Sequence, residues 1–454
     1  MNQRLKRVGL WLFALCTALL LCTAALALSV SLILRPAAGE WTETVRLGRW
    51  QHQVSMPTLL RMATHPFSLG LLQGRRLNTR FGPVRWAADA RPGTWRIVCA
   101  PCSFERNELG RERIVLSRVE FTLQRDLQMK LHGAFVLGDA PKAVHGRWSA
   151  RIEARQAELK FSLPDTPLEQ AFGLFAGAIP ELARARIEGS IGLTARLRLP
   201  SREWVLKPRI EGFTVSGLDT EALLGALPAC GAKHADTSFG PWLPRAVIAA
   251  EDQRFYEHRG FDLAEMVAAW SGHRRLNNST AGDTGGSPTG NIGSDGGDGA
   301  ERLRGASTLS QQLAKLVYTG DRPSHTRKLR ELLYAVELDR TLGKARVLNL
   351  YLAMAPWADG QCGAHAAARS LLGKRAAALT PVEAAWLASL LRNPNAALAQ
   401  MVRSGEVDVR RVGGVIDGMR PMPLARRQAA REELDTWRPD WLGPGEATAA
   451  FEKP

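Results

Sequence analysis

The N-terminal segment constrains the fold most strongly. Residues 8–34 form an uncharged, predominantly apolar run, and the basic residues Arg4, Lys6 and Arg7 precede it. Because an α-helix rises about 1.5 Å per residue, about 20 apolar residues cross the hydrocarbon core of a membrane. A basic flank favours the cytoplasmic side of the membrane. We therefore expect the bulk of the chain to lie on the outer side of the inner membrane. We therefore predict a cytoplasmic flank and a single-pass anchor within residues 1–36.

A cleaved secretory signal is the alternative interpretation of this segment. Ala25, Leu26 and Ala27 resemble a small-residue cleavage site. The apolar region of such a signal is usually about 7 to 15 residues long, which is shorter than this run. We therefore favour an uncleaved anchor.

The net charge narrows the choice of partner. The chain carries 60 Lys and Arg residues against 44 Asp and Glu residues, a formal net charge of +16. Such a balance favours an anionic partner, either a nucleic acid, a phospholipid surface or a phosphorylated substrate. Export of the chain argues against nucleic acid.

The sequence pattern of residues 40–218 predicts a β-rich domain. Apolar and polar residues alternate along short runs such as 119–123 and 187–193, which is typical of strands with one buried face. One helix is expected near Leu168 to Ala178, ending before Pro180. The repeated strands weakly resemble the β-modules of envelope proteins of the AsmA type. We see no catalytic constellation in this domain, and its function is open.

Cys99 and Cys102 form a close pair at the end of an expected strand, residues 94–98. In an oxidising compartment such a pair usually forms a disulfide. A thioredoxin-like redox motif has the same spacing but opens a helix in a βαβ unit. The strand leading into the pair therefore favours a structural disulfide.

Beyond residue 220 the pattern changes to a helical one. Ala- and Leu-rich stretches with a period near 3.6 extend to about residue 391. A Gly-, Ser-, Asn-, Asp- and Thr-rich tract, 271–299, interrupts them and is predicted to be a mobile loop, because it cannot bury enough apolar surface to offset its ordering entropy. We predict a mainly α domain at 220–400 and a C-terminal extension at 401–454.

The first candidate stretch for chemistry contains Glu251. On a helix, Glu251, Phe255 and His258 would share one face at i, i+4 and i+7. A carboxylate beside apolar residues can have a raised pKa and serve as a general base. The ordinary interpretation is a solvated or ion-paired glutamate on an amphipathic helix.

The second stretch runs from Gly305 to Lys315. Thr308 and Gln311 have capping-box spacing, so the ordinary interpretation is a helix start. The alternative is that helix N–H groups, together with Lys315, hold phosphate oxygens. The residues alone leave the two interpretations equal.

In the third stretch, Glu331 stands four residues after Arg327 and three after Lys328. Exposed pairs at this spacing contribute only about 0.2 to 0.5 kcal/mol each to helix stability. The alternative is that the cations face a diphosphate while Glu331 orients them or binds a divalent metal.

Together the three stretches resemble the glycosyltransferase family that polymerises lipid II, known from monofunctional transglycosylases and bifunctional penicillin-binding proteins (glycosyltransferase family 51). The resemblance covers roughly residues 243–395 in the family's order. The first family motif, E-D-x-x-F-x-x-H-x-G, is matched by Glu251, Asp252, Phe255, His258 and Gly260. The second, G-x-S-T-x-x-Q-Q-L-x-K, is matched by Gly305, Ser307, Thr308, Gln311, Gln312, Leu313 and Lys315. The third, R-K-x-x-E, is matched by Arg327, Lys328 and Glu331.

The sequence departs from the family further on. The family's Y-L-N is Tyr351-Leu352-Ala353 here, its E-W-G is Pro356-Trp357-Ala358, and its Y-F-G-K is Leu371-Leu372-Gly373-Lys374. Arg322 stands one residue farther from the Arg-Lys pair than the family's upstream arginine. The departures leave both glutamates intact and alter the outer wall of the site.

The resemblance implies an α+β multidomain protein: an N-terminal transmembrane helix, a β-rich periplasmic domain and a mainly α, lysozyme-like transglycosylase domain. It implies that lipid II and the growing lipid-linked glycan are the substrates, with the membrane and cell-wall synthesis proteins as partners. Glu251 would be the catalytic base, and Glu331 would act with Lys315, Arg327, Lys328 and a divalent metal, Mg or Mn, at the leaving diphosphate. Substrate contacts would come from the other matched residues: Asp252, Phe255, His258, Gly260, Ser307, Thr308, Gln311, Gln312 and Arg322.

Two other functions fit parts of this pattern. A lysozyme or lytic transglycosylase would share the fold, but glycan cleavage gains nothing from cations directed at phosphate. A silent homologue that binds lipid-linked precursor, or acts as an envelope scaffold, would fit the altered residues at 353–358. The retained Glu251 and Glu331 favour an active enzyme.

Overall fold

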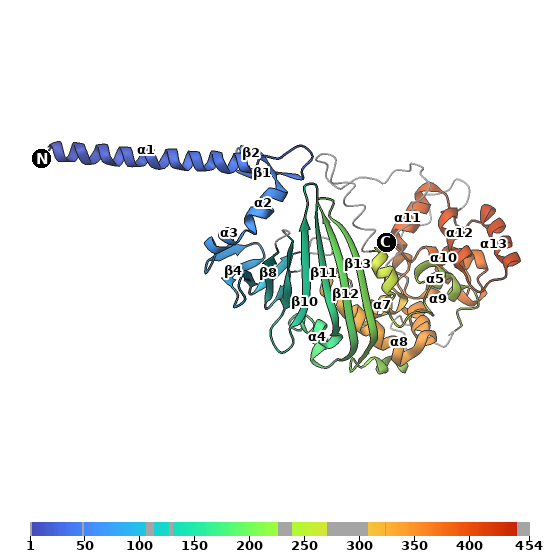
Figure 1. The fold of residues 1–454 in the computed structure, drawn as a ribbon. Coiled ribbons are helices and arrows are strands. Elements are labelled where there is room, and N and C mark those ends of the chain that lie inside the picture. Colours follow the sequence, from blue (N-terminus) through green and yellow to red (C-terminus); the bar gives the residue numbers. More distant parts are fainter. Residues whose placement is uncertain are drawn as a thin grey trace. The chain divides into compact units, whose positions relative to one another are not determined.

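The computed structural model describes residues 2–47, 50–105, 113–126, 130–225, 238–269, 307–322 and 324–442, shown in Figure 1. The chain forms two compact units. The first unit comprises residues 1–104, 114–166 and 191–209, and the second comprises 105–113, 167–190 and 210–454. Segments 167–190 and 210–218, which we had assigned to the β-rich domain, therefore group with the helical part. The predicted loop 271–299 lies outside the described residues.

The first unit begins with a long helix, α1 (Asn2–Ile33). Its stretch Leu15–Ile33 has a mean hydropathy of 2.3 and is not buried by the protein. Among the described residues it is the only helix long and apolar enough to cross a membrane. Its position agrees with the predicted anchor, and the crossing itself stays a prediction.

A nine-stranded sheet contains most of the β structure. Its order is β13-β12-β11-β10-β9-β8-β5-β4-β3, and the neighbouring strands from β3 to β11 pair antiparallel. The bounds are β3 Arg76–Thr79, β4 Gly82–Ala88, β5 Thr94–Cys99, β8 Val119–Arg125, β9 Leu131–Leu137, β10 Val144–Ile152, β11 Ala157–Pro167, β12 Arg186–Leu199 and β13 Glu203–Ser216. Two smaller sheets pair β1 (Thr42–Leu47) with β2 (Trp50–Ser55), and β6 (Cys102–Glu105) with β7 (Arg113–Leu116).

Alternation along the strands determines which face of this sheet is buried. In β10, Val144, Gly146 and Ala150 are buried, whereas Arg147 and Arg151 between and beyond them are exposed. A core cluster lies on the apolar face, made of Leu69, Leu123, Leu131 and Ala150 with Trp86, Trp95, Trp148, Ile152 and Leu159 packed against it. Strands β8 and β12 contain the alternating runs 119–123 and 187–193, where strands were predicted.

Two short helices of the first unit were not predicted. They are α2 (Met56–Ala63) and α3 (Pro66–Leu71), and α3 supplies the core residue Leu69. The Ser55 hydroxyl accepts a hydrogen bond from Thr58 N at 3.3 Å, which caps α2. Pro57 and Pro66 stand in the first turns, where proline is favoured. Cys99, which ends β5, and Cys102, which begins β6, are buried and joined by a disulfide.

The second unit is mainly helical. Its helices are α4 (Leu168–Gly173), α5 (Leu243–Glu251), α7 (Leu309–Ala314), α8 (His325–Met354), α9 (Ala364–Leu372), α10 (Pro381–Ser389), α11 (Pro394–Ser404), α12 (Val409–Gly418) and α13 (Leu424–Thr436). Short helical turns add η1 (Pro180–Ala183), η2 (Thr220–Leu224), η3 (Lys315–Thr319), η4 (Ala358–Gly360) and η5 (Ala376–Ala378). Helix α10 is buried from Val382 to Ser389, with α5, α12 and α13 packed around it, so residues beyond 400 complete this core. The predicted mixture of helix and sheet is confirmed.

Candidate active site

Glu251 is the last residue of α5, and the helix does not continue to His258. Asp252 has the extended φ/ψ of −156° and 73°, and residues 253–260 form turns. The predicted helical face of Glu251, Phe255 and His258 is therefore wrong. The physical reason is that the Asp252 carboxylate has partners outside the helix: Leu309 N donates to it at 2.9 Å, and His258 Nε2 lies 3.0 Å from both its oxygens.

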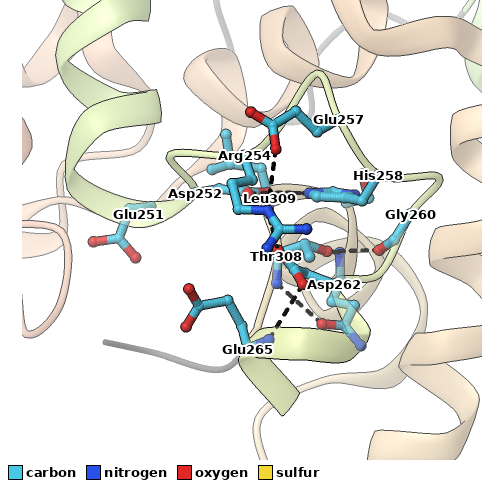
Figure 2. Close-up of polar contacts among 12 residues, drawn as sticks. Glu251, Asp252, Arg254, Glu257, His258, Gly260, Asp262, Glu265, Thr308 and Leu309 are labelled. Carbon is cyan, nitrogen blue, oxygen red and sulfur yellow. Dashed lines mark hydrogen bonds and ion pairs between the residues drawn. The ribbon is translucent and has the colours of Figure 1, made fainter. Parts of the chain in front are cut away.

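The turn that follows is fastened to α7 and α8. Figure 2 shows Asp252 hydrogen-bonded to His258 and to Leu309 N, and Thr308 hydrogen-bonded to Gly260. Thr308 Oγ1 donates to the Gly260 carbonyl at 2.6 Å. Gly260 has φ +85°, and a Cβ there would lie 2.4 Å from the Ala335 carbonyl oxygen. Only glycine permits this close approach to α8.

Glu251 points away from these hydrogen bonds, as Figure 2 shows. Gln312 Nε2 donates to Glu251 Oε2 at 3.0 Å, and Tyr351 OH donates to Gln312 Oε1 at 2.8 Å. Burial raises the pKa of Glu251, and the Gln312 bond and the charges of Arg411 and Arg392 only partly oppose the rise. Burial also raises the pKa of Tyr351 well above its usual value, so its hydroxyl stays protonated and able to donate.

A pocket of about 130 Å³ opens beside Glu251. The wall combines the end of α5 and the turn after it with the start of α7: Ala249, Ala250, Glu251, Asp252, Gln253, Arg254, Asp262, Glu265, Ser307 and Thr308. The structure therefore brings the first and second candidate stretches together around one carboxylate. Phe255 and His258 are buried instead, with 0% and 8% exposure, and they support the turn.

The second stretch begins with the predicted helix start. Thr308 caps α7, and the capping box with Gln311 is confirmed. The Leu309 and Gln311 N–H groups donate to Asp252 and to Thr308 Oγ1. Because these two N–H groups already donate within the protein, they are not the groups that would bind phosphate. Lys315 caps the other end of this short helix and pairs with the exposed Asp321 at 2.6 Å.

The third stretch lies at the start of α8. Glu331 is completely buried, with Arg327 Nε 3.0 Å from Oε1 and Lys328 Nζ 2.7 Å from Oε2. Lys328 Nζ also donates to Ser307 Oγ at 2.8 Å, which ties this stretch to the pocket wall. Arg327 Nη1 donates to the Gly320 carbonyl at 3.2 Å, and Arg322 is exposed near that turn. The spacing thus predicted both ion pairs correctly. They differ from surface pairs because the Glu331 carboxylate that they share is completely buried.

Glu331 does not fit a divalent metal. Each of its oxygens is in contact with a cation, which opposes binding of another positive charge. Hard cations also need several oxygen ligands. Among the residues that the structure describes, no group of three or more His, Cys, Asp or Glu side chains could hold an ion. The two contacts hold Arg327 and Lys328 beside one buried carboxylate.

Several residues of the site were missed as site residues. Tyr351 was named only in the comparison with the family's Y-L-N, although its hydroxyl donates a hydrogen bond to Gln312. Lys344 lies 4.4 Å from the Phe255 ring centroid and 2.5 Å from Asp339, and Asp339 accepts from Ser310 Oγ at 2.6 Å. These contacts join positions up to 89 residues apart, so local spacing contains no signal for them.

Comparison with known proteins gives a family match for part of the chain. A family model described as Transglycosylase matches residues 295–419. This part of the chain is similar to the transglycosylase family. The match extends past position 400, where we had placed the end of the domain. The Glu251 turn precedes it in sequence but meets the transglycosylase segment in space, through Asp252 and Leu309.

The similar curated proteins are named biosynthetic peptidoglycan transglycosylase. One, from Nitrosomonas eutropha, is 37% identical over 152 residues, which is 34% of this chain and 53% of the relative. One from Shigella boydii is 40% identical over 154 residues, 34% of this chain and 54% of the relative. One from Escherichia coli O1:K1 is 39% identical over the same length. The chain spans about half the length of the curated relatives it matches.

Proposed function

We propose that this protein is a peptidoglycan glycosyltransferase that polymerises lipid II into glycan strands and releases undecaprenyl diphosphate. The observation that carries the proposal is a partly buried glutamate in a pocket whose wall contacts a cluster of cations, Arg327 and Lys328. Glu251 lines the pocket, and Ser307 in the same pocket wall contacts Lys328. Transfer needs both a base for the attacking hydroxyl and positive charge for the departing diphosphate.

Glu251 acts as the general base in this proposal. The acceptor sugar's 4-hydroxyl attacks the anomeric carbon of the lipid-linked chain, and Glu251 takes its proton. Burial raises the pKa of Glu251, which makes its carboxylate a better base. Gln312 bonds one oxygen, Oε2, and orients the carboxylate. The second oxygen, Oε1, is thereby directed to the substrate.

The cations act on the leaving group. Negative charge builds on the diphosphate as the glycosidic bond breaks, and fixed positive charges lower that barrier. Arg327 and Lys328 are held by Glu331, and Lys315 begins the adjacent turn. Lys315 pairs with the exposed Asp321 here, so a diphosphate would replace Asp321 as its partner. The proposed reaction has no step through a metal.

The same proposal includes the localisation and the partners of the protein. Helix α1 would anchor it in the inner membrane with both units in the periplasm, where lipid II is presented. The membrane, lipid II, the growing glycan and cell-wall synthesis proteins are then its partners. The sheet-containing first unit has no proposed substrate.

Incubation of the purified full-length protein with labelled lipid II tests the proposal. We expect polymer to form, and preformed glycan strands to stay intact in a parallel reaction. Cleavage of those strands would favour a lytic enzyme. Binding of lipid II without polymer, under every metal condition and with candidate partner proteins, would contradict the proposal and favour a silent precursor-binding homologue.

A further inference from the structure

One face of α8 is occupied by contacts from outside the transglycosylase match. Arg330, Tyr334, Glu337 and Thr341 follow one another at intervals of four, three and four residues, so they share a helix face. We call the segments that bind this face, residues 179–183 and 215–224, the collar. Both the collar and α8 belong to the second unit. This face lies beside the one that carries Arg327 and Glu331.

The collar contacts are specific and partly buried. Leu218 N donates to both carboxylate oxygens of Glu337, at 3.1 and 3.0 Å. The hydroxyls of Thr220 and Thr341 lie 2.8 Å apart. Arg340 Nε donates to the Val215 carbonyl at 3.1 Å. The collar is therefore attached to α8 along several turns.

Glu181 makes the collar contact nearest the candidate site. Its side chain is 7% exposed, and Oε1 accepts from Arg330 Nε at 2.8 Å, from Arg330 Nη2 at 2.5 Å and from Tyr334 OH at 3.4 Å. Burial by itself would raise the pKa of Glu181, but the bonds and charge of Arg330 outweigh it and lower the pKa. A charged carboxylate is thus bound to Arg330, the residue directly before Glu331 on α8.

An aromatic stack connects Glu181 to Lys315. The Tyr334 ring lies flat on the Tyr318 ring, with centroids 4.1 Å apart and an interplanar angle of 3°. Tyr318 belongs to η3, the wide π-type turn that Lys315 begins. Such turns have uncommon hydrogen bonding and need support from tertiary contacts. The contacts run from Glu181 through Tyr334 and Tyr318 to the turn that presents Lys315.

We propose that Glu181 is a positioning residue, which holds α8 and the η3 turn so that Lys315 meets the leaving diphosphate beside Arg327 and Lys328. The proposal rests on the proposed function. Glu181 lies outside the matched residues 295–419, so the assignment comes from the contacts alone. The collar thereby couples the part of the chain before α5 to the reaction.

Four single variants test this proposal. Glu181→Gln keeps the size of the side chain and removes its charge. Tyr318→Phe keeps the ring stack, whereas Tyr318→Leu abolishes it. Glu188→Gln is the matched control, because Glu188 is an exposed carboxylate of the same unit that accepts from Thr214 Oγ1 at 3.0 Å. Each variant is compared with wild type in the full-length protein.

Polymerisation kinetics give the first measurement. We expect Glu181→Gln and Tyr318→Leu to lower kcat about tenfold with KM nearly unchanged, because misplacement of a charge acts on the transition state. Tyr318→Phe and Glu188→Gln should turn over like wild type. A purely structural contact would instead lower the melting temperature and the active fraction. Wild-type kcat in well-folded Glu181→Gln would overturn the proposal.

Hydrogen–deuterium exchange of residues 315–320 gives a second measurement that needs no turnover. Exchange there should be faster in Glu181→Gln and Tyr318→Leu, and unchanged in Tyr318→Phe and Glu188→Gln. Unchanged exchange in Glu181→Gln would overturn the positioning role even if wild type polymerises lipid II. Faster exchange in Glu181→Gln than in wild type, together with a wild-type protein that makes no polymer, would support the coupling and contradict the proposed function.

Discussion

The side-chain amide of Gln312 donates to Glu251 Oε2 at 3.0 Å. Burial raises the pKa of Glu251 above its ordinary value of 4.5, and this bond is the largest influence that lowers it. The pair therefore sets the pH range in which Glu251 is a carboxylate. A base works only when ionised, so activity should fall as the pH drops through this raised pKa.

Gln312→Met should move the acidic limb of kcat/KM to higher pH. The substitution keeps the length of the side chain and removes the donor, so the carboxylate loses stabilisation and the pKa of Glu251 rises further. Initial rates of polymerisation across a pH series measure the limb. Gln428→Met is the control, because Gln428 is an exposed glutamine of α13 outside the pocket wall. An unchanged limb in Gln312→Met would argue that Glu251 is not the titrating base.

Glu331→Gln should weaken lipid II binding as well as turnover. The neutral amide cannot hold Arg327 and Lys328 by charge, and two neighbouring cations would then repel each other. Titration of lipid II and initial rates measure the two effects. Glu383→Gln serves as the control, since Glu383 is also buried and pairs with Lys374 at 2.6 Å. Equal loss of binding in both variants would point to general destabilisation.

Replacement of Cys99 and Cys102 by Ser should lower the stability of the first unit and leave turnover unchanged. The disulfide closes a loop of sequence separation 3, which corresponds to about 2 kcal/mol in the chain-entropy estimate. Thermal unfolding measures the loss, and polymerisation per folded molecule is the comparison. Reduced turnover in well-folded protein would contradict a purely structural disulfide.

Protease added to spheroplasts should digest the chain beyond α1. The basic residues Arg4, Lys6 and Arg7 precede the apolar stretch Leu15–Ile33, so the N-terminus is expected to stay inside. Immunoblots against an N-terminal tag report on the cytoplasmic end of the chain, and immunoblots against a C-terminal tag report on the periplasmic part. Protection of the C-terminal tag in intact spheroplasts would contradict the periplasmic placement.

Local patterns predicted the elements whose contacts are local. Alternation predicted the strands at 119–123 and 187–193, and spacing predicted the Thr308 capping box and the Glu331 ion pairs. The helix through His258 was wrong because Asp252 bonds to Leu309, which is 57 residues away. Helices α2 and α3 are each only about two turns long, too short for a clear period.

The collar contacts could not be predicted from local patterns either, because they join distant parts of the sequence. Glu181 and Arg330 are 149 residues apart, and neither stands in a pattern that points to the other. Their pairing depends on the fold, which brings η1 and α8 together. The sequence contains the residues of the site, and the fold determines which of them meet.

Comparison of wild type with Glu251→Gln tests the central claim most directly. The variant keeps shape and hydrogen bonding but cannot accept a proton, so polymerisation of labelled lipid II should fall by about 10² or more while lipid II still binds. Polymer formation by Glu251→Gln at the wild-type rate would contradict the assignment of Glu251 as the base.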